Sequence, residues 1–250
     1  MTFRFIILAA GKGTRMKQEL PKALTPIGGK PILQHLYESV EASGVDGVPV
    51  IVIGSDQPKL CEAWNGVCEY VVQHEQLGTA HAVNVCRDAV TNADAIIVLY
   101  GDHPFISKET LQRLAHLHET SDGMLSMMTT TVPSFDAWPI YFHWGRIVRD
   151  KHGQIMAIRE YKDAMESEQA ITEVNPALYC FNTTWLWNNI GQVKNLNAKG
   201  EYYLTDLVEL AVAQGHDIAS MRIPPEEAVG INSQEERMIA EELLTRRHGS

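Results

Sequence analysis

The sequence predicts an α/β protein, a three-layer sandwich in which helices cover both faces of a mixed, mostly parallel sheet. Short runs rich in β-branched and aromatic residues occupy 3–8, 48–53, 70–73 and 95–100. Between them lie segments with helical spacing, such as 32–43 and 79–90. Alternation of this kind is typical of a parallel sheet whose connections are helices. The 250 residues, 45% of them hydrophobic, suffice for one large core.

The second half of the chain predicts a mixed extension of that sheet. Strand patterns occupy 124–132, 146–149, 154–159 and 173–181, with a hairpin turn at 150–153. We expect Thr205 to cap a helix to about Gln214, and Ser233 with Glu236 to form a capping box before a final helix to about Arg246. No linker or repeat divides the chain, so residues 1–250 are expected to form a single domain.

Composition excludes several classes of partner. A formal net charge of -10 argues against nucleic acid and anionic membranes, which attract basic surfaces. The apolar run near the N-terminus is too short to span a bilayer. The four cysteines lack the paired spacing of a zinc site or a disulfide framework, so we expect a soluble protein of the reducing cytoplasm. Nothing in the composition indicates an oligomeric state.

The loop after the first strand is the most informative segment. Ligands of α/β sheets bind beyond the carboxyl ends of the strands, and the small residues Ala9, Ala10, Gly11 and Gly13 follow directly there. The spacing fits neither a P-loop nor a dinucleotide fingerprint. Small residues allow backbone N–H groups to turn inward as an anion-binding nest, and Arg15 and Lys22 add two cations. The segment is therefore either a triphosphate cradle or a flexible turn with two solvated bases.

Two further groups of polar residues stand at strand ends. Asp102 follows the strand at 95–100 and is the best metal candidate, although a plain turn aspartate is an alternative. Gln73 and Gln76 carry carboxamides, which can both donate to and accept from a ligand. Thr79, three residues further on, could contact the same ligand or only cap the following helix.

Taken together, these segments resemble the sugar-nucleotide pyrophosphorylases. Within that family the chain is similar to the uridyltransferase domain of bifunctional N-acetylglucosamine-1-phosphate uridyltransferase/glucosamine-1-phosphate acetyltransferase. The resemblance rests on blocks that follow in order along most of the chain: LAAGKGTRM with LPK at 8–22, QHEQLGTAHA at 73–82, LYGDHP at 99–104, GRI at 145–147, EYKDA at 160–164, EVN at 173–175 and NAKGEYYLTD at 197–206.

The resemblance implies a Rossmann-like fold of the nucleotide-diphospho-sugar transferase type. It implies a nucleotide-binding half at about 1–105, a sugar-binding half at about 106–228, and a metal-ligand turn with a C-terminal helix at 229–250. UTP would react with a sugar-1-phosphate to give a UDP-sugar and pyrophosphate, with Mg²⁺ as the cofactor. No acetyl transfer is expected, because the chain ends where that second domain would begin.

Residue by residue, the resemblance implies four groups of site residues. The catalytic cations would be Arg15 and Lys22. Nucleotide contacts would come from Leu8, Ala9, Ala10, Gly11, Gly13, Thr14, Gln73, Gln76, Gly78 and Thr79. Sugar contacts would come from Gly101, Gly145, Glu160 and Asn175. The metal would be held by Asp102 and Asn232. For Asn232, a plain helix-flanking turn is the alternative interpretation.

The acceptor region departs from the family pattern. Phe142-His143-Trp144 replaces the usual Gly-Tyr, and Asn175-Pro176-Ala177 replaces the usual Asn-Thr-Gly. These changes either reshape the sugar site or only repack its outer surface. Three alternative functions therefore stay open: a thymidylyl or other nucleotidyltransferase for a different sugar-1-phosphate, a cytidylyltransferase for a non-sugar alcohol phosphate, and a non-catalytic nucleotide-sugar sensor.

Overall fold

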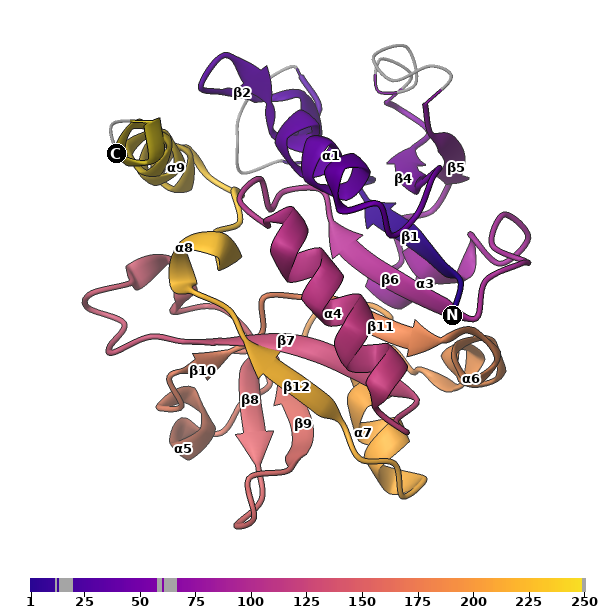
Figure 1. Ribbon diagram of the computed structural model, residues 1–250. Coiled ribbons are helices and arrows are strands. Elements are labelled where there is room, and N and C mark those ends of the chain that lie inside the picture. The colour runs from indigo at the N-terminus through magenta and orange to yellow at the C-terminus, as the bar shows by residue number, and fades with distance from the viewer. Residues whose placement is uncertain (12, 14–19, 58–59, 61–66, 249–250) are drawn as a thin grey trace.

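A mixed sheet forms the centre of the computed structural model, which describes residues 1–11, 13, 20–57, 60 and 67–248 (Figure 1). The strands are β1 (Phe3–Leu8), β2 (Pro26–Ile27), β3 (Lys30–Pro31), β4 (Val50–Gly54), β5 (Glu69–Gln73), β6 (Ala95–Tyr100), β7 (Leu125–Thr131), β8 (Arg146–Arg149), β9 (Ile155–Arg159), β10 (Glu173–Val174), β11 (Tyr179–Asn182) and β12 (Ala219–Arg222). The α-helices are α1 (Ile32–Ser43), α3 (Thr79–Asn84), α4 (Lys108–Thr120), α5 (Glu166–Gln169), α6 (Thr183–Asn189), α7 (Asp206–Ala213), α8 (Pro225–Ala228) and α9 (Gln234–His248). Three 3-10 helices are η2 (Lys22–Leu24), η3 (Pro139–Tyr141) and η4 (Ile190–Gln192).

The strand order is β5-β4-β1-β6-β11-β7-β10-β8-β9, with β12 paired to β7. Strands β5, β4, β1 and β6 are parallel, and β7 and β12 run in the same direction. Only β11 is reversed within this central part, because it is antiparallel to both β6 and β7. Strands β10, β8 and β9 continue the sheet as an antiparallel extension. The predicted mixed, mostly parallel sheet is confirmed.

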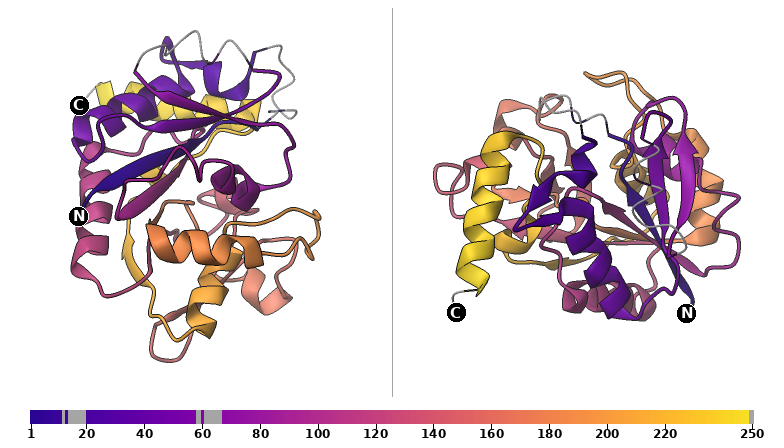
Figure 2. Two further views of the ribbon diagram at one scale, coloured as in Figure 1. Left: turned by 90° about the vertical axis from the view of Figure 1, so that its right-hand side faces the viewer. Right: turned by 90° about the horizontal axis from the view of Figure 1, so that it is seen from above.

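Helices cover both faces of the sheet because successive side chains of a strand point to opposite sides. In β1, Phe5 and Ile7 join the core beneath α1, α4 and α9, whereas Ile6 joins the core beneath α3, α6 and α7. The C-terminal helix α9 lies beside β2 in Figures 1 and 2. There Gly28 N–H donates to Glu241 Oε2 at 3.0 Å. Among the described residues, no helix has the length and apolar character needed to cross a bilayer.

Three local predictions need correction. The strand predicted at 173–181 is two strands, β10 and β11, separated by a turn that contains Pro176. The helix predicted at 79–90 ends at Asn84 and continues only as turns. Thr205 does precede α7, but its hydroxyl makes no capping hydrogen bond and has no described partner. In each case tertiary packing overrides the local pattern.

The turn between β10 and β11 holds Ala177 at a φ of 58°, the left-handed region. Its N–H donates to Asn175 Oδ1 at 3.0 Å, which closes a side-chain turn. For a residue with a Cβ atom this region costs roughly 1–2 kcal/mol. The turn therefore stores backbone strain beside Asn175.

We predict that Ala177→Gly stabilises the protein by about 0.5–1 kcal/mol, because release of the strain outweighs the extra freedom of glycine in the unfolded chain. The thermal midpoint, followed by circular dichroism, should rise by roughly 1–4 °C. The matched control is Ala213→Gly at the exposed end of α7, where glycine should lower the midpoint. An unchanged or lower midpoint for Ala177→Gly would show that the turn is unstrained.

Candidate functional site

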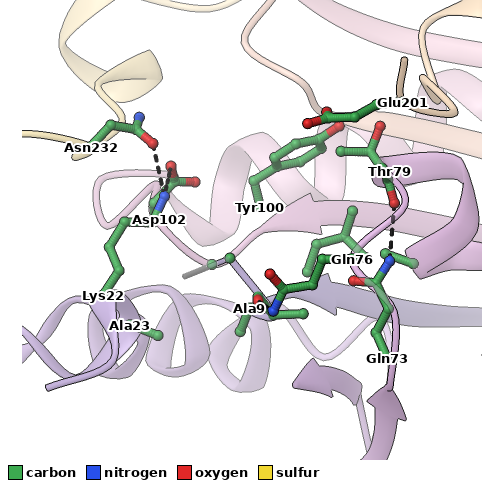
Figure 3. Close-up of a pocket in the computed structure, with 16 residues that line it drawn as sticks. Ala9, Lys22, Ala23, Gln73, Gln76, Thr79, Tyr100, Asp102, Glu201 and Asn232 are labelled. Atoms are coloured by element: carbon green, nitrogen blue, oxygen red, sulfur yellow. Dashed lines mark hydrogen bonds and ion pairs between the residues drawn. The ribbon is translucent and has the colours of Figure 1, made fainter. Parts of the chain in front are cut away.

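Two adjoining pockets open at the carboxyl ends of β1, β5 and β6, where the topology predicts ligands. The first pocket has a volume of about 350 Å³ and the second about 920 Å³. Five residues line both of them: Thr79, Tyr100, Asp102, Glu201 and Asn232. Figure 3 shows Lys22, Asp102 and Asn232 at one end of the first pocket and Gln73, Gln76 and Thr79 at the other.

The loop after β1 forms one wall of the first pocket. Two glutamine side chains hold its backbone, because Gln76 Nε2 donates to Ala10 O at 2.8 Å and Gln57 Nε2 donates to Gly11 O at 3.2 Å. Gly13 has a φ of 58°, and a Cβ atom there would lie 2.9 Å from Lys22 Cβ. A side chain at Gly13 would therefore displace Lys22. The predicted contacts of Thr14 and Arg15 lie outside the described residues.

Lys22 joins the two predicted metal ligands. Its ammonium group donates to Asp102 Oδ2 at 2.7 Å and to Asn232 Oδ1 at 2.8 Å (Figure 3). The turns that carry these ligands are themselves connected, since Ile231 N–H donates to Asp102 O at 2.9 Å. The fold therefore brings Asp102 and Asn232 together through Lys22, and their role as metal ligands stays a prediction.

Asp102 is ionised in this arrangement. Burial alone would raise the pKa of its carboxyl, but the positive charge of Lys22, the electrostatic interaction with His103 and the hydrogen bond from Lys22 together outweigh burial and lower it. The described part of the chain contains no group of three or more His, Cys, Asp or Glu side chains placed to hold a metal ion. A carboxylate oxygen and an amide oxygen nevertheless converge on one cation, the Lys22 ammonium, so the pair suits a hard cation that takes its other ligands from substrate or water.

The other end of the first pocket is fixed by a segment from the second half of the chain. Tyr202 N–H donates to Leu77 O at 2.8 Å, and Ala80 N–H donates to Tyr202 O at 2.9 Å. A Cβ atom at Gly78, whose φ is 120°, would lie 2.5 Å from Tyr202 O. Only glycine fits this approach. Thr79 does not cap α3, because its hydroxyl accepts from Leu204 N–H at 2.9 Å.

The second pocket brings together three of the predicted sugar-binding residues. Asn175 N–H donates to Gly145 O at 2.9 Å, and a Cβ atom at Gly145 would lie 3.4 Å from Glu160 Oε1. Burial raises the pKa of Glu160; nearby Lys199 lowers it, and Asp163, Asp206 and Glu201 raise it further. The side chains of Glu160 and Asn175 suit sugar hydroxyl groups, which both donate and accept. The fourth predicted residue, Gly101, lines the first pocket instead.

A buried arginine holds one wall of the second pocket. Arg146 is fully buried, and its guanidinium donates to the carbonyl oxygens of Tyr141, Phe142, Trp144 and Gln169. It also lies 5.3 Å from the ring centre of Tyr161. These contacts fix Trp144 and Tyr161, which both line the pocket. The departures from the family pattern at His143, Trp144 and Ala177 therefore reach the pocket itself.

Of the residues that line both pockets, two were missed by the sequence analysis. Tyr100 and Glu201 line both pockets, and Figure 3 places them beside Thr79. The position of Tyr100, directly before Gly101 and Asp102 at a strand end, could have indicated it. Glu201 lies in a loop, and only its place in the NAKGEYYLTD block pointed toward the site.

Comparisons with known proteins found a matching family model and similar relatives. A family model described as the MobA-like NTP transferase domain matches residues 5–168. The bifunctional protein GlmU of Desulfotalea psychrophila is 38% identical over 245 residues, covering 97% of this chain and 70% of the relative. The bifunctional protein GlmU of Brevibacillus brevis is 36% identical over 244 residues, covering 97% of this chain and 51% of the relative. The chain thus spans about half the length of several of the relatives that it matches.

Solved structures share the fold. A UDP-glucose pyrophosphorylase complexed with UDP-glucose superposes with a TM-score of 0.78 at 19% identity, covering 99% of this chain and 100% of the other. A putative glucose-1-phosphate thymidylyltransferase from Bacillus anthracis, in complex with a sucrose, gives a TM-score of 0.75 at 19% identity, with 96% of each chain covered. At this identity the likeness establishes the fold, which agrees with the predicted Rossmann-like sandwich.

We predict that Glu160→Gln stabilises the protein at neutral pH. The raised pKa means that the folded state binds a proton more tightly than the unfolded state, so stability falls as the pH rises from the ordinary value of 4.5 to the raised pKa. Glutamine removes this loss, so it flattens the pH profile of the thermal midpoint within that window and leaves the midpoint higher above it.

The matched control is Glu173→Gln. Although burial raises the pKa of Glu173, its hydrogen bonds and ion pair with Arg149 lower it overall. Its charge therefore stabilises the fold above the ordinary pKa, and the substitution should lower the midpoint at neutral pH. Equal midpoints for Glu160→Gln and the wild type at neutral pH would contradict the predicted cost of a buried charge.

Proposed function

Because the chain belongs to the family of MobA-like NTP transferase domains, we propose that it transfers a uridylyl group from UTP to a sugar-1-phosphate, giving a UDP-sugar and pyrophosphate. N-acetylglucosamine-1-phosphate is the proposed acceptor, on the likeness to the bifunctional GlmU proteins. The nucleotide would occupy the first pocket and the acceptor the second. One observation carries the proposal: Lys22, Asp102 and Asn232 meet where the two pockets join.

The proposed reaction is an in-line displacement. An oxygen of the sugar-1-phosphate attacks the α-phosphorus of UTP, a new O–P bond forms, and the bond to the departing pyrophosphate breaks with its electron pair. A phosphate monoester with a second pKa near 6 is already an anionic nucleophile at neutral pH. The enzyme therefore needs no general base, and its residues position the two phosphates and offset their charge.

Lys22 supplies a fixed positive charge at the junction of the pockets, and we propose Arg15 as a second cation on the same loop. Asp102 and Asn232 would hold Mg²⁺ through one carboxylate and one amide oxygen, since this ion prefers hard oxygen ligands and usually keeps several waters. Magnesium would supply charge stabilisation for the phosphates. With Mg²⁺ held by Asp102 and Asn232, the ammonium group of Lys22 would be available to the substrate phosphates.

Transfer to a different acceptor sugar is the second candidate function, and the lining of the second pocket supports it. Trp144, His143 and Ala177 line this pocket and depart from the family pattern. A thymidylyl or other nucleotidyltransferase with another sugar-1-phosphate would use the same Lys22, Asp102 and Asn232. A panel of nucleoside triphosphates and sugar-1-phosphates, assayed by pyrophosphate release, separates these activities. Magnesium-independent binding without turnover would instead support a nucleotide-sugar sensor.

We predict that Lys22→Ala lowers kcat on the order of 10²–10³-fold, because it removes a preorganised charge at the reacting phosphates. Asp102→Ala should do the same. Pyrophosphate release from UTP and N-acetylglucosamine-1-phosphate is the measurement, and the thermal midpoint is followed in parallel. The matched control is Lys30→Ala, since Lys30 is half-exposed, pairs with Glu38 and lines neither pocket. Wild-type turnover by either site variant would exclude that residue from the mechanism.

A further inference from the structure

The side-chain amide of Gln73 is held in one orientation. Its Nε2 lies 3.1 Å from Gly78 O and 2.9 Å from His81 Nδ1 (Figure 3 shows the first contact). A backbone carbonyl oxygen can only accept, so the group beside it must be the NH₂ and not the carbonyl of the amide. Both N–H bonds of Gln73 are then used, one by each partner. His81 Nδ1 is therefore an acceptor, which places the proton of the neutral imidazole on Nε2.

Only the Oε1 atom of Gln73 is left for a ligand. Gln73 lines the first pocket and is 4% exposed, and none of the residues described donates a hydrogen bond to Oε1. The pocket therefore presents a fixed acceptor at the end away from Lys22. If the amide could rotate by 180°, the same position would present a donor instead.

The position of His81 is itself fixed by the second half of the chain. His81 is the third residue of α3, and the first turn of that helix is tied to the 202–204 segment by Ala80 N–H to Tyr202 O and by Leu204 N–H to Thr79 Oγ1, both at 2.9 Å. His81 is half-buried. The helix backbone that carries the imidazole is therefore anchored beside Gln73.

We propose that His81 is a positioning residue that sets the nucleobase preference of the first pocket. By accepting from Gln73 it keeps Oε1 toward the base, where it pairs with the N3–H donor of uracil or thymine. Cytosine has a lone pair at N3, which the same oxygen repels. The proposal rests on the proposed function, in which a nucleoside triphosphate occupies this pocket, and it names the group that distinguishes a uridine or thymidine nucleotide from a cytidine nucleotide.

The test compares UTP with CTP in variants of His81. His81→Leu removes one of the two acceptors that hold the NH₂ of Gln73, so the turned amide costs less and the ratio of kcat/KM for UTP to that for CTP should fall on the order of tenfold. His81→Asn places its Oδ1 near the position of Nδ1 and should keep the wild-type ratio. His81→Gln has a similar polarity, but its oxygen lies one bond further out, so it should lose the preference as His81→Leu does. This pair decides the question even if the leucine variant does not fold.

The matched control is His74→Leu. His74 is exposed and adjacent to Gln73 in sequence, so this substitution should leave the ratio unchanged. Affinities for UTP and CTP, measured by calorimetry without an acceptor sugar, give the same comparison without turnover and should follow the same order among the variants.

Two results would overturn the inference. A wild-type UTP-to-CTP ratio in both His81→Leu and His81→Gln would show that Gly78 O alone orients the amide. A loss of preference in His81→Asn equal to that in His81→Leu would show that the size of the imidazole matters and its acceptor does not. Failure of the proposed function looks different, because wild-type protein would then bind UTP more tightly than CTP but release no pyrophosphate from UTP with any acceptor.

Discussion

The contact of Lys22 with Asp102 and Asn232 connects the parts of the molecule that the site requires. Asp102 and Asn232 follow Lys22 by 80 and 210 positions in the sequence. Adjacent parallel strands make this possible, since β1 and β6 pair along their whole length and end at the same edge of the sheet. The loop after β1 delivers Lys22, and the turn after β6 delivers Asp102. The last segment before α9 then adds Asn232, so the site forms only when the whole chain is folded.

The wall of the second pocket depends on a different kind of cation. Arg146 is fully buried, and its described hydrogen bonds go to backbone carbonyl oxygens and none to a carboxylate. A buried guanidinium is tolerated when its donors are satisfied, and each carbonyl that it satisfies also fixes a piece of irregular backbone. Lysine could not do this, because it lacks the planar, five-donor geometry. The hydrogen bonds of Arg146 therefore hold the loop that carries Trp144 in its shape, as backbone hydrogen bonds do in a helix or strand.

The sequence predicted the central sheet because buried parallel strands are continuous apolar runs. It predicted Ala9 to Gly11 and Asp102 as candidate site residues because ligands of α/β sheets bind at strand ends. The resemblance added Gly145, Glu160 and Asn175, which the fold brings together although no local pattern connects them. Periodicity could not indicate the left-handed Ala177, the break between β10 and β11 or the partner of Thr79. The bond between Leu204 and Thr79 joins residues 125 positions apart, and Asn175 at the β10–β11 turn donates to the distant Gly145 O. The bond of Ala177 to Asn175 is local, but it leaves no periodic pattern in the sequence.

The same long-range bonds connect the two pockets. The 202–204 segment belongs to the half that lines the second pocket, yet its backbone holds Leu77, Thr79 and Ala80 beside the first pocket. Glu201, directly before this segment, lines both pockets. The 202–204 segment therefore ties the wall of the second pocket to the end of the first pocket that holds Gln73. Because packed segments of this kind shift as units, the groups that line one pocket cannot adjust independently of the groups that line the other.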